Sequence, residues 1–450
     1  MSEEKNHFVA VIGAGPAGLF GARELAVGGA QVVLFNRDIK PGGLAEYGIY
    51  PDKHTMKGGL RKQFHQVLDN QNITYYGNVK IGAQGDLSLD DLRCLGFQAL
   101  LVTAGAQGTK WLGLPGENLR GVYHAKDVVY YYNRLPPYSQ WAFHFGKRCA
   151  IIGAGNVMVD IARFLIREKK VDEVISVVRR GPGEVNFTKE EMKHIVANLD
   201  LAAFETELRR VLPALEAVSE TSDVGRQKVL DALPKADPKF ADTRFRFEFL
   251  TSPVGMLGED GVLTGLEVED NILVQKDGDL KARGTGHRRV IAVDTVIFAI
   301  GDRVDASVGL PVASNEFIKN PAPRFPVEST SYEAFDPTSN APIADVFVGG
   351  WSRQASEGLV GVARKDGTNA ARAVQQYLQT LPTAMPNLDE VGKKMKSLGK
   401  PIITKDELHR LESMEAAEAQ KRGVEEFKFA SNDEMLQALG LEETAVNSAH

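Results

Sequence analysis

The chain has 450 residues, which is enough for about three domains of average size. Its 43% hydrophobic and 25% charged residues are ordinary for a globular protein, and its net charge of −6 argues against nucleic acid as the main partner. The two cysteines, Cys94 and Cys149, are far apart. They therefore provide no dithiol centre, no four-cysteine iron–sulfur site and no zinc cluster, and no metal site is predicted.

The sequence also gives an expectation for the compartment. Low cysteine usage is typical of a reducing cytoplasm. Residues 1–5 are polar and lack the hydrophobic region of a signal peptide. No apolar run approaches the roughly 18 residues that a membrane span needs. We therefore expect a cytoplasmic protein without a membrane span.

The first 35 residues have the pattern of a strand–helix–strand unit. Residues 8–12 form a short apolar run followed at once by glycines, which indicates a buried strand. Residues 16–26 have helical spacing, and residues 31–35 are a second apolar run. A further buried strand is expected at 99–103.

A second unit of the same kind follows, with a strand at 149–152, a helix at 157–167 and a strand at 174–178. Strands ending in glycine return at 293–300 and 346–348, before a helix at 359–378. We therefore predict an α/β protein with two Rossmann-like domains, the second inserted into a discontinuous first. The expected boundaries are 1–108 with 300–382 for the first domain, 109–299 for the second, and 383–450 for a C-terminal helical extension.

That C-terminal extension is charged and mostly helix-like, and it follows a proline-containing linker at residues 381–386. Its simplest interpretation is a solvated helical segment packed on the outside. A role in docking a partner is the alternative, and no motif supports it.

The first glycine motif is VIGAGPAG at residues 11–18, which follows a strand and opens a helix. Gly13 allows a tight turn, Gly15 lets the backbone approach a pyrophosphate, and Gly18 lets the helix pack closely on the strand. The helix N-terminus then presents free N–H groups to the phosphates. Pro16 and Ala17 in this position are typical of FAD-binding flavoproteins, and the alternative is an empty structural turn.

The end of the second strand departs from the dinucleotide pattern. An acidic residue is expected there to bind a ribose hydroxyl, but the position holds Asn36, followed by Arg37 and Asp38. An asparagine side chain can still form a hydrogen bond with a hydroxyl. Binding is therefore still expected.

The second motif, IIGAGNVM at residues 151–158, replaces the third glycine by Met158. A larger side chain there should push the helix off the strand, as is common where NADP rather than FAD is bound. The next strand ends in Arg179 and Arg180. Arginines suit the 2′-phosphate of NADP because each donates a bidentate fork. The alternative is a solvated basic turn.

Two nucleotide sites in one chain imply hydride transfer between them. A nicotinamide gives two electrons to a flavin as hydride, and a flavin can then release them singly. The chain has no cysteine pair or iron–sulfur ligands, so the next acceptor is expected outside it.

Several further segments resemble one family, the adrenodoxin reductase-like ferredoxin–NADP(+) reductases. The run PGGLAEYGIYPD at 41–52 resembles the segment along the flavin, and residues 76–79 resemble a strand that faces FAD adenine. The NADP segment is matched most specifically, at 155–157 with Asp160 and at 179–182 with 187–188 and Glu191. Further likenesses lie at 131–136, 350–351, 358–360 and 433–436.

Together the motifs and the resemblance imply FAD and NADP(H) as cofactors and a ferredoxin or similar one-electron carrier as partner. The implied FAD contacts are Gly13, Gly15, Pro16, Ala17, Gly18, Asn36, Gly43, Leu44, Tyr47, Val79, Gly105, Gly350, Trp351, Gly358, Leu359 and Val360. The implied NADP contacts are Ala154, Gly155, Asn156, Val157, Arg179, Arg180 and Glu191, with Gly358.

Two departures from the family leave the electron acceptor open. The family's Pro-Asp-His becomes Asp52-Lys53-His54, with one extra residue, and its Gly-Pro-Thr-Gly becomes residues 355–358 with a carboxylate at Glu357. A carboxylate near the flavin could lower its reduction potential or change which partner docks. An electron-input subunit of a larger redox complex, similar to the glutamate synthase small subunit, is the main alternative. A non-catalytic nucleotide-binding protein is a further one.

Asp160 and His54 are the candidate catalytic residues. Asp160 lies one helical turn past the nucleotide glycines and His54 lies in the flavin-side segment, so together they could relay a proton. The alternatives are that Asp160 only forms a hydrogen bond near the nucleotide and that His54 is a surface histidine.

An acidic ferredoxin predicts a basic docking surface. The candidate residues all lie in the inserted domain, with acidic residues interleaved, so an ordinary charged surface is the alternative: Arg209, Arg210, Arg226, Lys228, Lys235, Lys239, Arg244 and Arg246. The tyrosines at 130–132 are expected to pack in the core and between domains.

Overall fold

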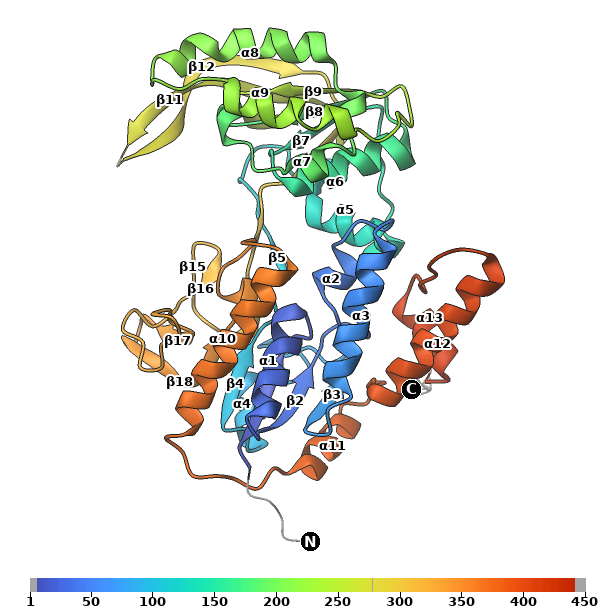
Figure 1. Ribbon diagram of the computed structural model, residues 1–450, viewed down its shortest axis with the longest axis vertical. Coiled ribbons are helices and arrows are strands. Elements are labelled where there is room, and N and C mark those ends of the chain that lie inside the picture. The colour runs from blue at the N-terminus through green and yellow to red at the C-terminus, as the bar shows by residue number, and fades with distance from the viewer. Residues whose placement is uncertain (1–5, 277, 442–450) are drawn as a thin grey trace. The chain divides into compact units, whose positions relative to one another are not determined.

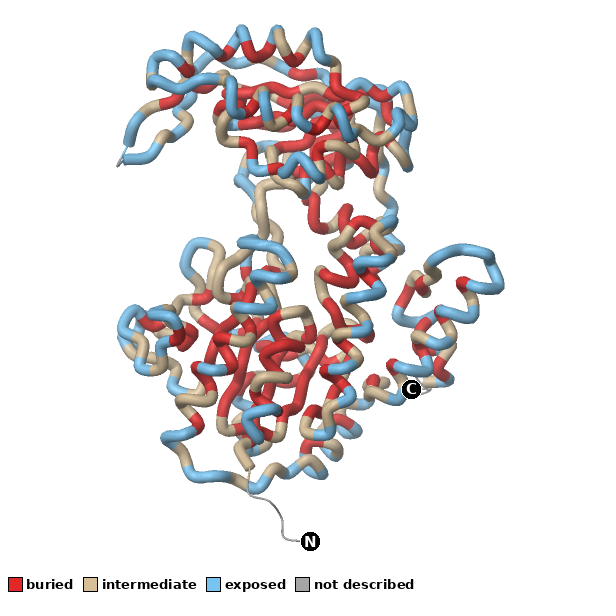
Figure 2. The backbone as a smooth tube through the Cα atoms, viewed as in Figure 1, coloured by how far each residue is buried: buried red, intermediate tan, exposed pale blue. Residues whose placement is uncertain are grey.

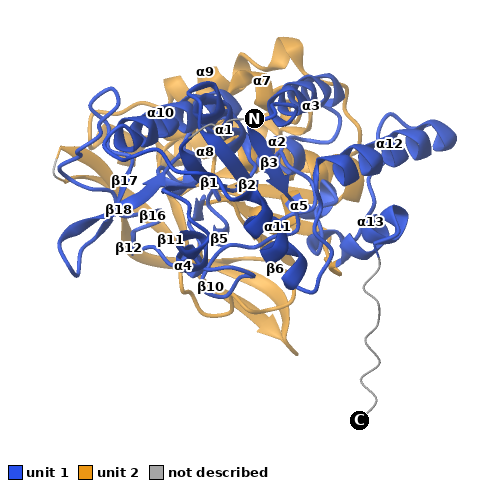
Figure 3. Ribbon diagram, turned by 90° about the horizontal axis from the view of Figure 1, so that it is seen from below, with its two compact units in different colours: residues 1–109, 130–140, 301–450 blue, residues 110–129, 141–300 orange. Residues whose placement is uncertain are grey.

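The computed structural model describes residues 6–276 and 278–441, and the chain divides into two compact units. Unit 1 comprises Met1–Thr109, Tyr130–Gln140 and Gly301–His450, and unit 2 comprises Lys110–Val129 and Trp141–Ile300 (Figure 3). Within the described ranges, no helix combines the length and the apolar character that crossing a membrane requires. Each unit has a main sheet of its own, so each is described by itself.

The sheet of unit 1 has six strands in the order β17-β18-β4-β1-β2-β3 (Figure 1). All neighbouring pairs are parallel except β17 with β18, which is antiparallel. The strands are β1 (Phe8–Ile12), β2 (Gln31–Phe35), β3 (Ile73–Tyr76), β4 (Ala99–Val102), β17 (Glu333–Asp336) and β18 (Ala341–Val348). The parallel order with crossover helices is the Rossmann-like arrangement that the sequence predicts.

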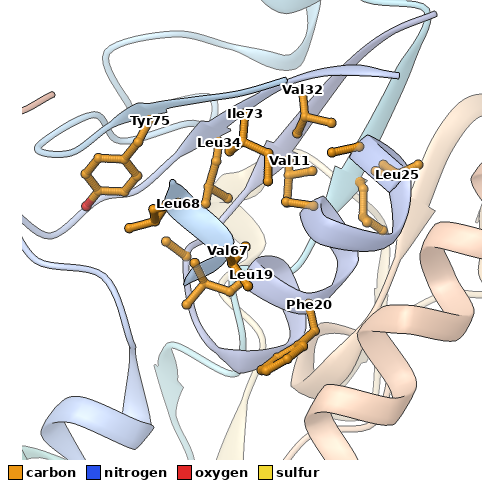
Figure 4. Close-up of a cluster of buried hydrophobic side chains, with 14 of the residues drawn as sticks. Val11, Leu19, Phe20, Leu25, Val32, Leu34, Val67, Leu68, Ile73 and Tyr75 are labelled. Carbon is orange, nitrogen blue, oxygen red and sulfur yellow. The ribbon is translucent and has the colours of Figure 1, made fainter. Parts of the chain in front are cut away.

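Both faces of this sheet are covered around β1, β2 and β4, which explains why these strands are apolar without alternation. Val9 and Val11 face one cluster with α1 (Pro16–Val27), α3 (His54–Leu68) and α10 (Val360–Leu378) (Figure 4). Ala10 and Ile12 face a second cluster on the other side. All four strand residues are buried.

The remaining short elements of unit 1 lie in the connections between these strands and helices. They are α2 (Leu44–Tyr47), α4 (Leu89–Cys94), η1 (Tyr138–Gln140), the paired strands β5 (Gly108–Thr109) and β14 (Asp302–Arg303), η6 (Ala306–Val308), the paired strands β15 (Val312–Ala313) and β16 (Glu316–Phe317), and η7 (Gly350–Ser352). Helix α5 (Ala125–Tyr132) crosses the boundary between the two units.

The C-terminal region is helical, as the sequence predicts, with α11 (Leu388–Ser397), α12 (Lys405–Arg422) and α13 (Asn432–Leu439). These helices are more than a solvated extension. Leu408, Leu411 and Met435 are buried in the same cluster as α1 and α3, and the buried side of the helices is visible in Figure 2. Ile403 also forms an antiparallel bridge with Gly77, directly after β3. The region therefore contributes to the core of unit 1.

Unit 2 has a five-stranded parallel sheet in the order β6-β13-β7-β8-β9. Its strands are β6 (Val122–His124), β7 (Arg148–Ile152), β8 (Glu173–Val177), β9 (Arg244–Glu248) and β13 (Thr295–Phe298). Its helical elements are α6 (Asn156–Phe164) with a π-helical turn η2 (Leu165–Lys169), η3 (Pro182–Glu184), α7 (Lys189–Met192), η4 (Val196–Asn198), α8 (Leu201–Glu216), α9 (Asp223–Leu230) and η5 (Leu233–Lys235).

A second sheet in unit 2 was not predicted from the sequence. It is antiparallel, in the order β10 (Thr251–Glu259), β11 (Val262–Lys276) and β12 (Asp279–Ile291). Leu266 and Val268 of β11 share one buried cluster with Ile152 and Ile175 of the parallel sheet. In β12 the single buried residue is Ile291, so that strand lacks the apolar pattern by which a strand is found.

Candidate functional site

The first glycine motif forms a tight turn between β1 and α1. Gly13 has a φ of +102°, and a Cβ there would lie 2.6 Å from the carbonyl oxygen of Thr103. Its N–H donates to the carbonyl of Phe35 at 2.7 Å, which fastens the turn to β2. A Cβ on Gly18 would lie 1.8 Å from the carbonyl oxygen of Gly13. No side chain fits at position 18, so α1 packs directly on the turn.

The middle glycine of this motif meets open space. Gly15 is the N-cap of α1, with Pro16 in the first turn and no side chain capping the helix. A Cβ on Gly15 would have no atom within 4 Å. The open space beside Gly15 adjoins the N-terminus of α1. The unpaired N–H groups at a helix N-terminus carry a partial positive charge, which suits a phosphate.

Two further predicted residues, Gly43 and Gly350, lie close to this turn. The N–H of Gly42 donates to the carbonyl of Ala14 at 2.7 Å, and a Cβ on Gly43 would lie 3.2 Å from the Cα of Gly15. Gly350 has a φ of +62°, and a Cβ there would lie 2.6 Å from the Cβ of Ala17. Gly43 and Gly350 thus both lie close to the start of α1.

The segments after β4 and β18 meet at the same end of the sheet. The N–H of Gly105 donates to the hydroxyl of Ser352 at 3.0 Å. Trp351 is half-buried, and its indole N–H donates to the carbonyl of Glu357 at 2.9 Å. Residues 356–359 are exposed, and Val360 begins α10. The structure therefore places Gly350 beside the first turn and joins the segment that follows it to the end of β4 through Ser352.

Asn36 is buried and its side chain is engaged by the chain's own backbone. Its Oδ1 accepts the N–H of Ala14 at 3.1 Å, and its Nδ2 donates to the carbonyls of Asp38 at 2.8 Å and Lys40 at 2.9 Å. Its backbone carbonyl accepts the N–H of buried Val79 at 2.8 Å. The geometry therefore gives Asn36 a role in fixing the turn and the 38–40 loop.

A buried ion network lies directly beside these residues, and sequence reasoning missed it. Glu46, on the short helix α2 with Leu44 and Tyr47, is 2.7 Å from the Nζ of Lys428 and forms a bidentate pair with Arg61 at 2.6 and 2.7 Å. These cations hold the pKa of Glu46 well below its usual range, against its burial. Lys428 lies far along the chain, so neither spacing nor periodicity could reveal the contact.

The second glycine motif repeats the first turn in unit 2. Gly153 has a φ of +136°, and a Cβ there would lie 2.4 Å from the carbonyl oxygen of Ala299. Its N–H donates to the carbonyl of Val177 at 3.0 Å. Gly155 is the N-cap of α6, and a Cβ on it would again have no atom within 4 Å. This turn also leaves room for a phosphate.

The segment after β8 returns to this second turn. The N–H of Asn186 donates to the carbonyl of Ala154 at 2.9 Å, and the N–H of Thr188 donates to the side chain of Asn156 at 2.9 Å. Thr188 caps α7, which carries Glu191. Of the NADP residues predicted, Ala154, Gly155, Asn156 and Glu191 are thus brought together, with exposed Val157 on the first turn of α6.

The two arginines follow β8 at the carboxyl end of the parallel sheet. Arg179 is exposed, and Arg180 is half-buried, with its Nε 2.9 Å from Oε2 of Glu184. Burial raises the pKa of Glu184 and the guanidinium of Arg180 opposes that rise. A dianionic group at this loop would therefore find the guanidinium of Arg179 accessible and that of Arg180 already facing the carboxylate of Glu184.

The candidate catalytic residues lie in different units. His54 begins α3 in unit 1, and its Nε2 is 3.0 Å from Oε2 of Glu425. Asp160 lies on α6 in unit 2 and is half-buried. The proton relay between them stays a prediction.

Most of the candidate basic docking residues are paired with acids inside unit 2, which favours an ordinary charged surface. The pairs are Arg210–Glu207, Arg226–Glu205, Lys235–Glu190, Lys239–Asp242, Arg244–Asp200, Arg244–Glu173, Arg246–Glu173 and Arg246–Glu248. Tyr130, by contrast, is buried with Tyr47 and Leu135, as expected for a core residue.

Similarity to known proteins points to one family. Residues 7–200 match the pyridine nucleotide-disulphide oxidoreductase family. The mitochondrial NADPH:adrenodoxin oxidoreductase of Arabidopsis thaliana is 29% identical over 460 residues, covering 93% of this chain and 92% of its own. The NADPH-ferredoxin reductase FprA of Mycobacterium tuberculosis is 25% identical over 475 residues, covering 96% and 98%. The chain is thus similar, over nearly its whole length, to adrenodoxin reductase-like ferredoxin–NADP(+) reductases.

The fold of the chain agrees with that similarity. A solved structure of Mycobacterium tuberculosis FprA in complex with NADPH superposes with a TM-score of 0.80, at 23% identity, over 97% of this chain and 99% of that one. The two-domain α/β class predicted from the sequence is confirmed by this likeness.

Proposed function

We propose that this protein is an FAD-dependent oxidoreductase that transfers hydride between NADP(H) and flavin and passes single electrons to a ferredoxin-type carrier. The observation that carries the proposal is the pair of glycine turns, each with an open space before a helix N-terminus at the carboxyl end of a parallel sheet. The reaction class is proposed from the similarity to NADPH:adrenodoxin oxidoreductase and NADPH-ferredoxin reductase.

Unit 1 fits FAD. Gly15 leaves room for a pyrophosphate, while Gly43 and Gly350 bring backbone close to the start of α1, where side chains on them would crowd Gly15 and Ala17. The FAD residues predicted from the sequence are proposed as its contacts, with the region 350–360 and Tyr47 toward the ring end. When bound, the flavin accepts hydride and releases electrons singly.

Asn36 is proposed to act on FAD by holding the turn. Its amide already has partners on three backbone groups. A turn that is already held in its binding conformation lowers the entropic cost of binding the ligand.

Unit 2 fits NADP(H). Gly155 leaves the phosphate space open and Asn156 ties residue 188 to the turn, which places the loop after β8 beside it. Arg179 and Arg180 are proposed to bind the 2′-phosphate, and Glu191 to lie near the nucleotide. Two guanidinium groups favour NADPH over NADH because NADH has no 2′-phosphate to pair with them.

The proposed domain roles follow the sequence boundaries, with FAD bound by 1–108 and 300–382 and NADP by 109–299. Residues 383–450 are proposed to stabilise the FAD unit through α12 and Lys428. His54 and Asp160 are proposed to hold or move a proton between solvent and the flavin side. A cytoplasmic location is proposed on the low cysteine content.

A second candidate is an electron-input subunit of a larger redox complex. The exposed segment 356–359, with Glu357 and with Leu359, a residue that is 72% exposed, favours it because such a surface suits a protein partner. Size-exclusion chromatography with light scattering on native extracts discriminates the two. A monomer or homodimer with full carrier activity contradicts the subunit hypothesis.

The direct test is NADPH-driven reduction of a ferredoxin-coupled dye by the purified protein. Activity that requires both NADPH and added ferredoxin supports the proposal. A flavin that NADPH reduces but that never passes electrons to any ferredoxin contradicts the carrier assignment and leaves the nucleotide sites in place.

A further inference from the structure

Two helices of unit 1 that are distant in sequence bring two imidazoles and a carboxylate together. His65 lies in the last turn of α3, and His409 and Glu412 lie three residues apart on one face of α12. The Nε2 of His65 is 2.8 Å from Oε2 of Glu412. The two imidazole rings stack with centroids 5.2 Å apart and an interplanar angle of 25°. One ligand atom from each of the three residues lies within 4.8 Å of the others.

A second carboxylate completes the cluster. Asp69, just after α3, has its Oδ1 3.8 Å from Nε2 of His409. The side chains of His65 and Glu412 are 26% and 22% exposed, and those of His409 and Asp69 are 49% and 62% exposed. The cluster is therefore anchored between the helices and open to water on one side, so a cation can enter. If His65 and Glu412 formed only an ion pair, that pair would not require His409 and Asp69 beside it. The presence of all four groups therefore favours a cation site.

We propose that His65, His409 and Glu412 form a binding site for a zinc-class divalent cation, with Asp69 or water as the fourth ligand. Zinc binds imidazole nitrogen and carboxylate oxygen tetrahedrally at about 2.0–2.2 Å, which places ligand atoms roughly 3.4 Å apart. The His65–Glu412 contact is already shorter than this, and side-chain rotation closes the remaining gap. The cysteine pattern predicts no metal site, and the ligands of this one come from helices distant in sequence.

The site has a structural role that follows from its place on α12. One turn beyond Glu412, Glu415 forms a buried ion pair with Lys40, directly before the Gly42–Gly43 turn of the proposed FAD site. A cation shared by α3 and α12 holds the C-terminal helix on the same unit at the neighbouring turn. A ligand that binds only the folded form stabilises it by mass action, so zinc is expected to raise the thermal midpoint.

Zinc titration of the full-length, flavin-containing protein, tag-free and stripped with EDTA, tests the site by isothermal titration calorimetry. We expect one zinc per chain and a higher thermal midpoint with zinc. His409→Ala and Glu412→Gln are each expected to weaken zinc binding at least about tenfold and to abolish the midpoint shift. Carrier reduction without zinc stays unchanged in both variants.

His287→Ala is the matched control. His287 is an exposed imidazole with its Nδ1 2.9 Å from Oδ2 of Asp270, so it offers zinc one histidine and one carboxylate but no second imidazole. This variant is expected to retain wild-type binding. X-ray absorption at the zinc edge should show two imidazoles per zinc. The absence of a saturable site below about 100 µM, or equal binding by wild type, His409→Ala and Glu412→Gln, overturns the proposal.

Discussion

The two glycine turns of this molecule share one backbone design but differ at their third glycine. In both turns the first glycine has a positive φ and packs against a carbonyl, and the middle glycine faces open space. In unit 1 the third position is Gly18, and a Cβ there would overlap the carbonyl of Gly13. In unit 2 the same position is Met158, which is fully buried.

The difference separates two functions of a glycine in this motif. The first two glycines shape the turn and clear the phosphate space, so both units keep them. The third sets how closely the helix packs on the turn, so it is required where α1 packs directly on it and dispensable in unit 2. The binding site can therefore be perturbed without disturbing the helix packing.

The largest expected effect comes from Gly18→Ala. Because the new Cβ would meet the Gly13 carbonyl at 1.8 Å, we expect loss of the bound flavin and of the folded unit 1. Gly15→Ala is the matched control, since its Cβ meets nothing within 4 Å and its φ of −77° is ordinary. It should fold but bind FAD at least about tenfold more weakly. Flavin absorbance measures FAD binding and circular dichroism measures folding in the two variants. A yellow, stable Gly18→Ala protein contradicts the packing argument.

In unit 2 the comparison predicts a loss of selectivity when the arginines are changed. Arg179→Ala should raise the KM for NADPH by about 10- to 100-fold, as expected for a lost hydrogen bond between charged groups, and leave the KM for NADH unchanged. Steady-state dye reduction with both nucleotides measures it. Arg209→Ala, an exposed arginine on α8, serves as the control. An equal rise for NADPH and NADH would show that Arg179 does not read the 2′-phosphate.

Asn36→Asp tests how the first turn is held. The substitution places a carboxylate oxygen against the carbonyls of Asp38 and Lys40, which now accept hydrogen bonds at 2.8 and 2.9 Å. We expect a loss of about 1–3 kcal/mol in the free energy of unfolding, measured with urea at pH 7.5. A variant that is as stable as wild type and binds FAD more tightly would instead assign position 36 to the ribose.

The smallest expected effect concerns Asp127 on α5. Burial raises the pKa of this carboxyl to about 6, from 3.8. A folded-state pKa above the unfolded value means that stability is lost as pH rises through 4 to 6. Asp127→Asn removes the free-energy cost of burying the charged carboxylate. It should stabilise the protein by about 1–2 kcal/mol at pH 7.5, with a smaller gain at pH 5.0. Equal gains at the two pH values would show that charge is not the cause.

The sequence predicted the parts of this molecule that depend on local chemistry. The strands β1 and β2, the start of α1 at Pro16 and both glycine turns follow from apolar runs and glycine spacing. The contacts of Lys428 with Glu46 and of His65 with Glu412 could not be predicted, because they join residues distant in sequence. The β12 strand was missed because it is almost wholly exposed. For Asn36 the sequence suggested a ligand contact, which stays a prediction, and it gave no sign that the side-chain amide also binds the backbone.

The most direct test of the two-site account is an anaerobic absorption titration of the purified protein, first with NADPH and then, on a fresh sample, with NADH. The account predicts a flavin spectrum that NADPH bleaches at concentrations at least about tenfold below those needed with NADH. Equal bleaching by both nucleotides would contradict the role of Arg179 and Arg180. A colourless protein that takes up no added FAD would contradict the flavoprotein assignment itself.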